Sequence, residues 1–255
     1  MAGILPGAVS DHDDAARYAA EAGALLLALR EQTVLEEWER FTLGDAGDVL
    51  ANRRLLDLLG AEHPDDPVLS EESADDPRRH RAERVWIVDP LDGTREFTER
   101  GRTDWAVHVA LWERGVLRAG AVALPAQDRL LSTAEPPVVP APDGRRLRVV
   151  VSRTRPPVAA RRVAATLDAE LVAMGSAGAK AMAVVTGEVD AYVHAGGQYE
   201  WDSAAPAAVA EAAGLHVSRL DGSPLRYNQP DPWLPDLVVC RPELADAIVA
   251  AAAPV

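Results

Sequence analysis

Apolar residues in the first quarter of the chain recur at helical spacing. One long helix is predicted from Asp11 to Arg40, with Asp11 or Asp13 as its cap. Two glycines and two aspartates predict a loop from Thr42 to Asp48, and a second helix is predicted from Val49 to Leu59. The apolar face of the first helix consists of Ala15, Ala19, Ala22, Leu26 and Leu29.

Short apolar runs bounded by turn residues follow and predict strands. The first of these strands runs into two acidic residues, Glu71 and Glu72. The second is expected to end at Asp89-Pro90, because proline has no N–H to donate to a sheet ladder. The runs are Val68–Glu72, Val85–Val88, Trp105–Trp112, Gly120–Leu124 and Arg129–Ser132.

The segment Glu135–Gly144 contains four prolines and one glycine. It is the predicted boundary between an N-terminal α+β half, residues 1–134, and a C-terminal α/β half, residues 145–255. Beyond it, predicted strands and helices alternate. The strands are Leu147–Val151, Glu170–Met174, Val189–Val193 and Leu237–Cys240, and the helices are Pro157–Leu167, Ala177–Thr186, Ser203–Ala213 and Pro242–Ala252.

Composition and charge narrow the classes of function. The chain has 255 residues, is 48% hydrophobic and carries a formal net charge of -14. Such a field repels nucleic acid and anionic membranes, and it repels a small phosphorylated substrate unless bound cations reverse it locally. The single cysteine, Cys240, excludes an internal disulfide and is predicted to be a buried thiol. With no signal-peptide pattern and no membrane-spanning run, the expected location is the cytoplasm.

The segment Trp86–Phe97 carries the first chemical signal. An apolar strand delivers Asp89 to the end of a sheet, and Asp92 follows with the Leu91 carbonyl between them. Carboxylate and carbonyl oxygens are the ligands of magnesium and calcium, and Gly93 and Thr94 offer N–H groups and a hydroxyl to a phosphate. Alternatively, Asp-Pro-Leu-Asp-Gly is only a turn, since these are common turn residues.

Two further acidic positions favour a metal site. Glu71 and Glu72 end another predicted strand, and Asp202 follows Trp201 at a helix start, where N-capping is its alternative role. Two carboxylates ~5 Å apart at an effective dielectric near 20 repel by roughly 3 kcal/mol. If these side chains converge, cations or protons must neutralise them.

Three ordered blocks resemble the signatures of the inositol monophosphatase superfamily. These blocks are Leu69-Ser-Glu-Glu72, Trp86-Ile-Val-Asp-Pro-Leu-Asp-Gly-Thr94 and Trp201-Asp-Ser-Ala-Ala-Pro206. Arg95-Glu96-Phe97 and Gly175-Ser-Ala-Gly-Ala-Lys180 are similar to segments of its CysQ-type 3'(2'),5'-bisphosphate nucleotidases, the actinobacterial type above all. The likeness spans nearly the whole chain and implies a layered α-β-α-β-α sandwich.

The resemblance also implies a set of roles for the site. Glu71, Asp89 and the Leu91 carbonyl would hold one magnesium ion, and Asp89, Asp92 and Asp202 a second, with Glu71 helping a third. Gly93 and Thr94 would bind phosphate, and Thr94 with Glu71 would orient the attacking water. Ser176 and Lys180 would contact the nucleotide, while Arg95, chosen for its charge, would bind a second phosphate.

The expected activity is hydrolysis of the 3'-phosphate of 3'-phosphoadenosine 5'-phosphate, a by-product of sulfate activation, by metal-activated water. The family's D-x-x-T-x-x-D pattern lacks its threonine here, so that Asp45 or Asp48 is left for the acidic role. Inositol-1-monophosphatase or fructose-1,6-bisphosphatase activity stays open, as does a metal-binding regulator without turnover. The resemblance further implies lithium sensitivity and a homodimer.

Overall fold

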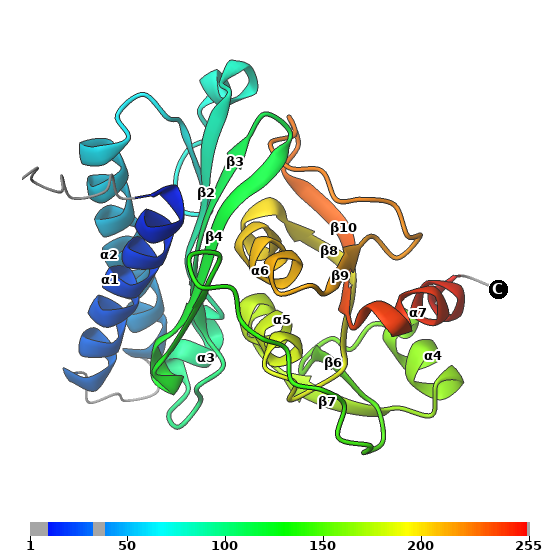
Figure 1. Cartoon of the computed structure of the whole chain (residues 1–255). Helices are drawn as coiled ribbons and strands as arrows, with labels where there is room; N and C mark the ends of the chain where they lie inside the picture. Colours follow the sequence, from blue (N-terminus) through cyan, green and yellow to red (C-terminus); the bar gives the residue numbers. More distant parts are fainter. Residues whose placement is uncertain (1–9, 33–38, 254–255) are drawn as a thin grey trace, which may run out of the picture.

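The chain folds into five alternating layers of helices and sheets (Figure 1). This computed structural model describes residues 10–32 and 39–253. Helices α1 and α2 form the first layer, a five-stranded sheet the second, α5 and α6 the third, another five-stranded sheet the fourth, and α4 with α7 the fifth. The predicted α-β-α-β-α sandwich is confirmed.

The outer helices α1 (Asp11–Gln32) and α2 (Glu39–Glu62) cover one face of the first sheet. The apolar periodicity of α1 explains its packing, because Ala15, Ala19, Ala22 and Leu26 are all buried against that sheet or α2. These contacts leave the opposite face of the sheet free to bury a second set of side chains.

The first sheet has the order β1-β2-β3-β4-β5. Its strands are β1 (Val68–Ser70), β2 (Arg84–Asp92), β3 (Ala106–Glu113), β4 (Val116–Leu124) and β5 (Arg129–Ser132). β1 runs parallel to β2, with Ser70 opposite Val88. The two strands therefore end at the same edge, which brings Glu71 beside Asp89.

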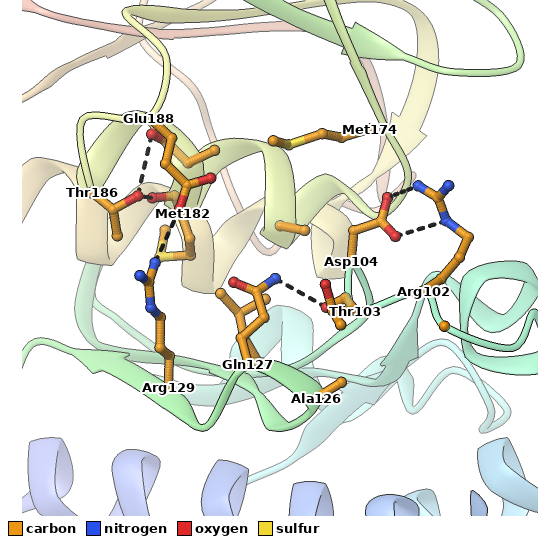
Figure 2. A pocket seen from close by; sticks show the side chains of 14 residues that line it. Arg102, Thr103, Asp104, Ala126, Gln127, Arg129, Met174, Met182, Thr186 and Glu188 are labelled. Carbon is orange, nitrogen blue, oxygen red and sulfur yellow. Dashed lines mark hydrogen bonds and ion pairs between the residues drawn. The ribbon is translucent and has the colours of Figure 1, made fainter.

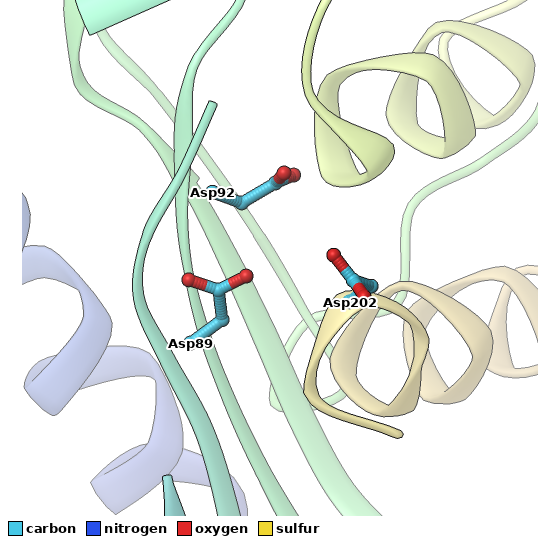
Figure 3. A group of neighbouring side chains, drawn as sticks. All are labelled: Asp89, Asp92 and Asp202. Atoms are coloured by element: carbon cyan, nitrogen blue, oxygen red, sulfur yellow. The ribbon is translucent and has the colours of Figure 1, made fainter. Parts of the chain in front are cut away.

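The central layer consists of α5 (Ala177–Val185) and α6 (Glu200–Ala212), packed between the two sheets. Small residues allow a close approach: a Cβ added to Gly120 on β4 would lie 2.6 Å from the Ala208 Cβ on α6. One apolar cluster here joins side chains from both halves of the chain, such as Ile87 and Val150. The N-termini of both helices point toward the end of β2 (Figure 3).

The second sheet has the order β7-β6-β8-β10-β9. Its strands are β6 (Arg148–Ser152), β7 (Glu170–Met174), β8 (Ala191–Tyr199), β9 (His216–Ser218) and β10 (Trp233–Cys240). Helices α4 (Val158–Thr166) and α7 (Ala245–Ala252) cover its outer face. Cys240 is buried there as a free thiol, and burial raises its pKa to about 12. The segment Glu135–Gly144 lies between the two sheets in sequence and contains no helix or strand.

Two predicted boundaries were wrong. Thr42–Asp48 belongs to α2 and is not a loop. Its glycines serve close packing: a Cβ on Gly44 would lie 2.8 Å from the Thr94 Cγ2, and one on Gly47 3.0 Å from the Leu91 Cδ2. The predicted single helix over Asp11–Arg40 ends at Gln32, and residues 33–38 lie outside the described part.

Pro90 also does not end β2, which continues to Asp92. The pairing with β3 passes from Asp89–His108 directly to Asp92–Ala106. Pro90 and Leu91 therefore lie in an irregularity of the ladder, where the missing N–H breaks no ladder bond. The predictions also missed β9 and the short helix α3 (Thr94–Thr98), which are too short to show a period. The predicted helix Pro242–Ala252 consists of a 3-10 turn, Pro242–Leu244, followed by α7.

None of the described helices has both the length and the apolar character that a bilayer span requires.

Candidate metal centre

Three aspartates converge where β2 meets the N-terminal turn of α6 (Figure 3). One oxygen of each of Asp89, Asp92 and Asp202 lies within 4.8 Å of the others. Asp89 and Asp92 come from the irregular end of β2, so the break in the ladder turns both carboxylates toward the same space. Distant parts of the sequence thus form one acidic cluster.

Asp89 is the most deeply buried member of this cluster, at 1% exposure. Its Oδ1 accepts a hydrogen bond from the Leu91 N–H at 3.1 Å. Its Oδ2 has no hydrogen-bond partner among the described residues, and the His108 Nδ1 lies 3.9 Å from it. Burial, followed by the charges of Asp92, Glu71 and Asp202, raises the pKa of this carboxyl well above its usual value. An unpaired buried carboxylate oxygen is costly unless a cation or proton meets it.

Asp92 has the opposite electrostatic environment. It accepts hydrogen bonds from the Ser176 hydroxyl at 2.5 Å and from the Ala177 and Gly178 N–H groups at 3.0 and 2.6 Å. These donors are the N-terminus of α5, where backbone N–H groups are free to bind an anion. Burial alone would raise the pKa of Asp92, but His108, Lys180 and Ser176 outweigh it and lower the pKa.

His108 on β3 lies directly beneath this site and is fully buried. Its Nδ1 lies 3.0 Å from the Trp201 carbonyl oxygen, and its Nε2 lies 3.3 Å from the Asp92 Oδ2. A Cβ on Gly178 would come within 2.0 Å of the His108 Nε2, so only glycine fits there. The imidazole therefore links the end of β2 to the start of α6.

Asp202 lies in the first turn of α6, three residues after the N-cap residue Tyr199. Its Oδ2 accepts a hydrogen bond from the Tyr199 N–H at 2.6 Å and so helps to cap the helix, and its carboxylate also belongs to the acidic cluster. Burial and the Asp92 charge raise the pKa of Asp202 to about 6. Burial, then Asp202 and Asp92, raise the pKa of Glu71 to about 7.

The donor set fits a hard divalent cation. Two ionised carboxylates whose oxygens lie within 4.8 Å of each other repel by at least about 3.5 kcal/mol at an effective dielectric of 20. Such repulsion, together with the orphaned Asp89 Oδ2, is relieved by an ion that accepts several oxygen ligands. All donors in the cluster are oxygens, which suits magnesium better than a thiolate-seeking metal.

Thr94 stands beside the cluster at the start of α3. Its Oγ1 lies 3.2 Å from the Leu91 carbonyl oxygen and 3.4 Å from the Asp48 Oδ1. Of the two candidates, it is Asp48 rather than Asp45 that contacts Thr94, because α2 continues through this segment. Burial and the Glu72 charge raise the pKa of Asp48 to about 7. Gly93 precedes Thr94 with φ 86°, a conformation that favours glycine.

A cleft of about 510 Å³ opens over the acidic cluster. Ser176 and Lys180, which the resemblance suggested as nucleotide contacts, line this cleft, and both are buried. The Lys180 Nζ donates to the Gly175 and Ser176 carbonyls at 3.2 and 2.5 Å. Burial lowers the pKa of this lysine.

Arg95 lies away from the lining of the cleft. Its side chain is 67% exposed and pairs with Glu99 at 3.3 Å. Arg155 lies at the cleft instead, and its exposed side chain has no hydrogen-bond or ion-pair partner among the described residues. The short distance from Asp92 in sequence suggested Arg95, but α3 turns that side chain outward.

A larger cavity of about 610 Å³ lies on another side of α5 (Figure 2). Its charged side chains are already paired, Arg102 with Asp104 and Arg129 with Glu188 at 3.1 Å. None of the acidic cluster lines it. The smaller cleft therefore has the better chemistry for a phosphorylated ligand.

Sequence reasoning missed several residues of the cleft. His108, Arg155, Tyr199 and Trp233 all lie at or beneath it. His108 lies within a run of consecutive buried residues on β3, so a polar residue inside an apolar strand was the available signal. For Arg155, Tyr199 and Trp233, no local pattern distinguishes them from ordinary surface residues.

Comparisons with known proteins agree with this geometry. The sequence profile of the inositol monophosphatase family matches residues 13–254. The chain is 56% identical over 247 residues to the 3'-phosphoadenosine 5'-phosphate phosphatase of Mycobacterium leprae, covering 92% of this chain and 90% of that protein. It is 36% identical over 206 residues to the 3'(2'),5'-bisphosphate nucleotidase CysQ of Escherichia coli, covering 74% and 81%.

The fold has matching relatives among solved structures. The crystal structure of CysQ from Bacteroides thetaiotaomicron superposes with a TM-score of 0.77 at 28% identity, over 92% of this chain and 98% of that one. Inositol monophosphatase II of Staphylococcus aureus gives a TM-score of 0.78 at 23% identity, over 92% of each chain. The match over nearly the whole length, together with the acidic cluster, shows that the chain belongs to the inositol monophosphatase family.

Proposed function

We propose that this protein hydrolyses the 3'-phosphate of 3'-phosphoadenosine 5'-phosphate to give AMP and phosphate, with magnesium as cofactor. The observation that carries the proposal is the convergence of Asp89, Asp92 and Asp202 beneath a cleft that Lys180 and Arg155 also line. The M. leprae relative, 56% identical, bears the name of this activity. Because the protein is strongly acidic, it can accept a bisphosphate only where bound metal ions and basic side chains make the local charge positive.

Two to three magnesium ions would occupy the acidic cluster. Asp89, Glu71 and the Leu91 carbonyl would hold the first, Asp89, Asp92 and Asp202 the second, and Glu71 would contribute to a third. When bound, such ions supply Lewis acidity that makes water nucleophilic near neutral pH and offsets charge on a phosphoryl group.

The chain's own residues would orient the reactants. The Gly93 and Thr94 N–H groups start α3 and would bind phosphoryl oxygens. Thr94 Oγ1 and Glu71 would hold the attacking water in line with phosphorus. Asp48 would fix the Thr94 hydroxyl, since the two side chains lie 3.4 Å apart. Orientation of this kind lowers the barrier because the reactants no longer lose their freedom during the reaction.

Arg155 would take the second phosphate in place of Arg95. Its guanidinium has no partner among the described residues, whereas Arg95 is paired with Glu99. An arginine can bind a phosphate through two parallel hydrogen bonds. Ser176 and Lys180 would contact the nucleotide from the α5 side of the cleft. The homodimer and the cytoplasmic location that the resemblance implies are part of the same proposal.

A phosphate-release assay on three substrates tests this function. With magnesium, 3'-phosphoadenosine 5'-phosphate should be hydrolysed faster than inositol 1-phosphate or fructose 1,6-bisphosphate, and chelation should abolish the reaction. Asp92→Asn should lose activity, while Asp57→Asn, whose side chain is 66% exposed, should retain it as the matched control. Equal rates on all three substrates would refute the nucleotide preference. An Asp92→Asn variant with full activity would refute the metal-dependent site.

A further inference from the structure

Two large aromatic side chains are exposed side by side at the cleft. Tyr199 is 45% exposed and Trp233 is 48% exposed, and both line the cleft above the acidic cluster. They are direct partners across the antiparallel pair β8 and β10. Opposed residues of neighbouring strands project from the same face of a sheet, so both rings lie on the same side of it. We refer to Tyr199 and Trp233 together as the aromatic surface.

Local contacts hold each ring in place. Tyr199 stacks on Trp201, with ring centroids 4.7 Å apart and an interplanar angle of 11°. Trp233 lies over Gly197, where an added Cβ would approach its Nε1 to 2.6 Å. Gly197 has φ 94°, so glycine suits both the backbone and the overlying ring. Both rings are thus positioned before any ligand binds.

This aromatic surface lies next to the acidic cluster. The Tyr199 N–H donates to the Asp202 Oδ2 at 2.6 Å, so the chain passes directly from the ring to a cluster carboxylate. Gly196 and Gly197 also line the cleft, and at these two positions it presents backbone rather than side chains. A flat ligand group can therefore approach the sheet closely beside the rings.

We propose that Tyr199 and Trp233 bind the purine base of the substrate by stacking and so determine its preference for nucleotides. This inference rests on the proposed function, and it identifies the base as the recognised group. A polyol phosphate has no π face to stack, and it would leave both rings exposed. A nucleotide with its 3'-phosphate at the acidic cluster has its base as the remaining flat, uncharged part.

Stacking of one base on aromatic side chains contributes affinity corresponding to a factor of about 5 to 150. The affinity for AMP should exceed the affinity for ribose 5-phosphate by the same factor, since these two ligands share the sugar and the 5'-phosphate and differ only in the base. A role confined to the structure of the cleft would instead change the affinities for both ligands by the same factor.

Calorimetric titration of the magnesium-loaded protein with AMP and with ribose 5-phosphate tests the inference. For the wild type, AMP should bind more tightly than ribose 5-phosphate. In Trp233→Ala and Tyr199→Ala, the ratio of the two affinities should fall by about 5- to 150-fold. Trp233→Phe and Tyr199→Phe should restore most of the ratio because they keep an aromatic face. Leu171→Ala, an exposed position on β7 of the same sheet, is the matched control and should keep the wild-type ratio.

An unchanged ratio in both alanine variants, or an equal loss of affinity for both ligands, would overturn the inference. If the alanine variants fail to fold, fluorescence of the folded proteins decides. AMP, but not ribose 5-phosphate, should quench tryptophan emission of the wild type more than that of Trp233→Phe, and equal quenching of the two proteins would overturn it. These measurements need no turnover, so absence of phosphate release would refute the proposed function separately.

Discussion

Replacing Asp89 by asparagine should stabilise the metal-free protein at alkaline pH, although the substitution removes a carboxylate from the acidic cluster. The carboxyl is 1% exposed, and its Oδ2 has no hydrogen-bond partner among the described residues. Burial and the neighbouring carboxylates raise its pKa well above the usual range. The amide of asparagine keeps an acceptor for the Leu91 N–H and offers a donor to the adjacent carboxylates.

The size of the effect follows from the geometry and from linkage. One ionised neighbour with an oxygen within 4.8 Å costs at least about 3.5 kcal/mol at an effective dielectric of 20. If Asp89 instead keeps its proton in the folded protein at pH 8, although an aspartate has an ordinary pKa near 3.9, the cost to stability is at most about 5.6 kcal/mol. The gain should therefore be about 3 to 6 kcal/mol at pH 8. A raised folded-state pKa costs stability only as pH rises, so the gain should shrink below about 2 kcal/mol at pH 5.

Thermal unfolding in EDTA at pH 5 and pH 8 measures both values. For a chain of this size, 3 kcal/mol corresponds to an increase in Tm of at least about 6 °C. Magnesium should narrow this difference, because at 100 times its Kd it should stabilise the wild type by about 2.7 kcal/mol but stabilise Asp89→Asn far less. Asp57→Asn, on the surface of α2, is the matched control.

Two results would refute this reasoning. One is an Asp89→Asn variant that is less stable than the wild type in EDTA at pH 8. The other is a difference in Tm that is the same at pH 5 and pH 8, because the electrostatic cost must change with ionisation.

Four other predictions follow from the contacts around the site. Thr94→Val loses the contact with Asp48 and should lower kcat by at least about 100-fold, although magnesium should still raise its Tm. Thr94→Ser keeps the hydroxyl and should retain most activity. A kcat of Thr94→Val within a few-fold of the wild type would contradict a role of the Thr94 hydroxyl in orienting water. Arg79→Met should lower the free energy of unfolding, measured in urea, by about 2 to 4 kcal/mol, because the fully buried guanidinium binds the Asn228 side chain and the Gln229 carbonyl. An unchanged midpoint of urea unfolding would contradict a stabilising role of these contacts. Magnesium should bind more tightly at pH 8 than at pH 6, because it competes with a proton on Glu71, whose pKa is raised to about 7; calorimetry showing equal affinity would exclude such competition. Lithium should inhibit magnesium-dependent phosphate release at concentrations where sodium has no effect, and calcium should replace magnesium poorly. Full activity in the presence of lithium, or with calcium in place of magnesium, would contradict a site selective for magnesium.

The layers of the fold could be predicted because each element carries its own pattern. Helix α1 shows the apolar period that buries it, and β2 reads as a continuous apolar run because both its faces are covered. The loop predicted over Thr42–Asp48 was wrong because glycine has two uses that look alike in sequence. Gly44 and Gly47 allow α2 to pack closely on its neighbours, and only the fold distinguishes this from a turn.

The metal cluster was predictable for a related reason. The carboxylates lie at the ends of strands and in the first turn of a helix. Because β1 and β2 are parallel, their ends lie at the same edge of the sheet, and the carboxylates there come together. The cleft around them was not predictable. Arg95 was expected to face the substrate because it adjoins Thr94 in sequence, yet α3 directs it to Glu99. Arg155 and Trp233 reach the cleft only through the arrangement of the second sheet.

Anomalous scattering from crystals soaked in manganese, as a substitute for magnesium, tests the central claim most directly. We expect strong peaks bounded by carboxylate oxygens of Asp89, Asp92 and Asp202, and we expect these peaks to be lost from crystals of the Asp92→Asn variant. Peaks at other positions only, or the same peaks with undiminished height in that variant, would contradict this claim.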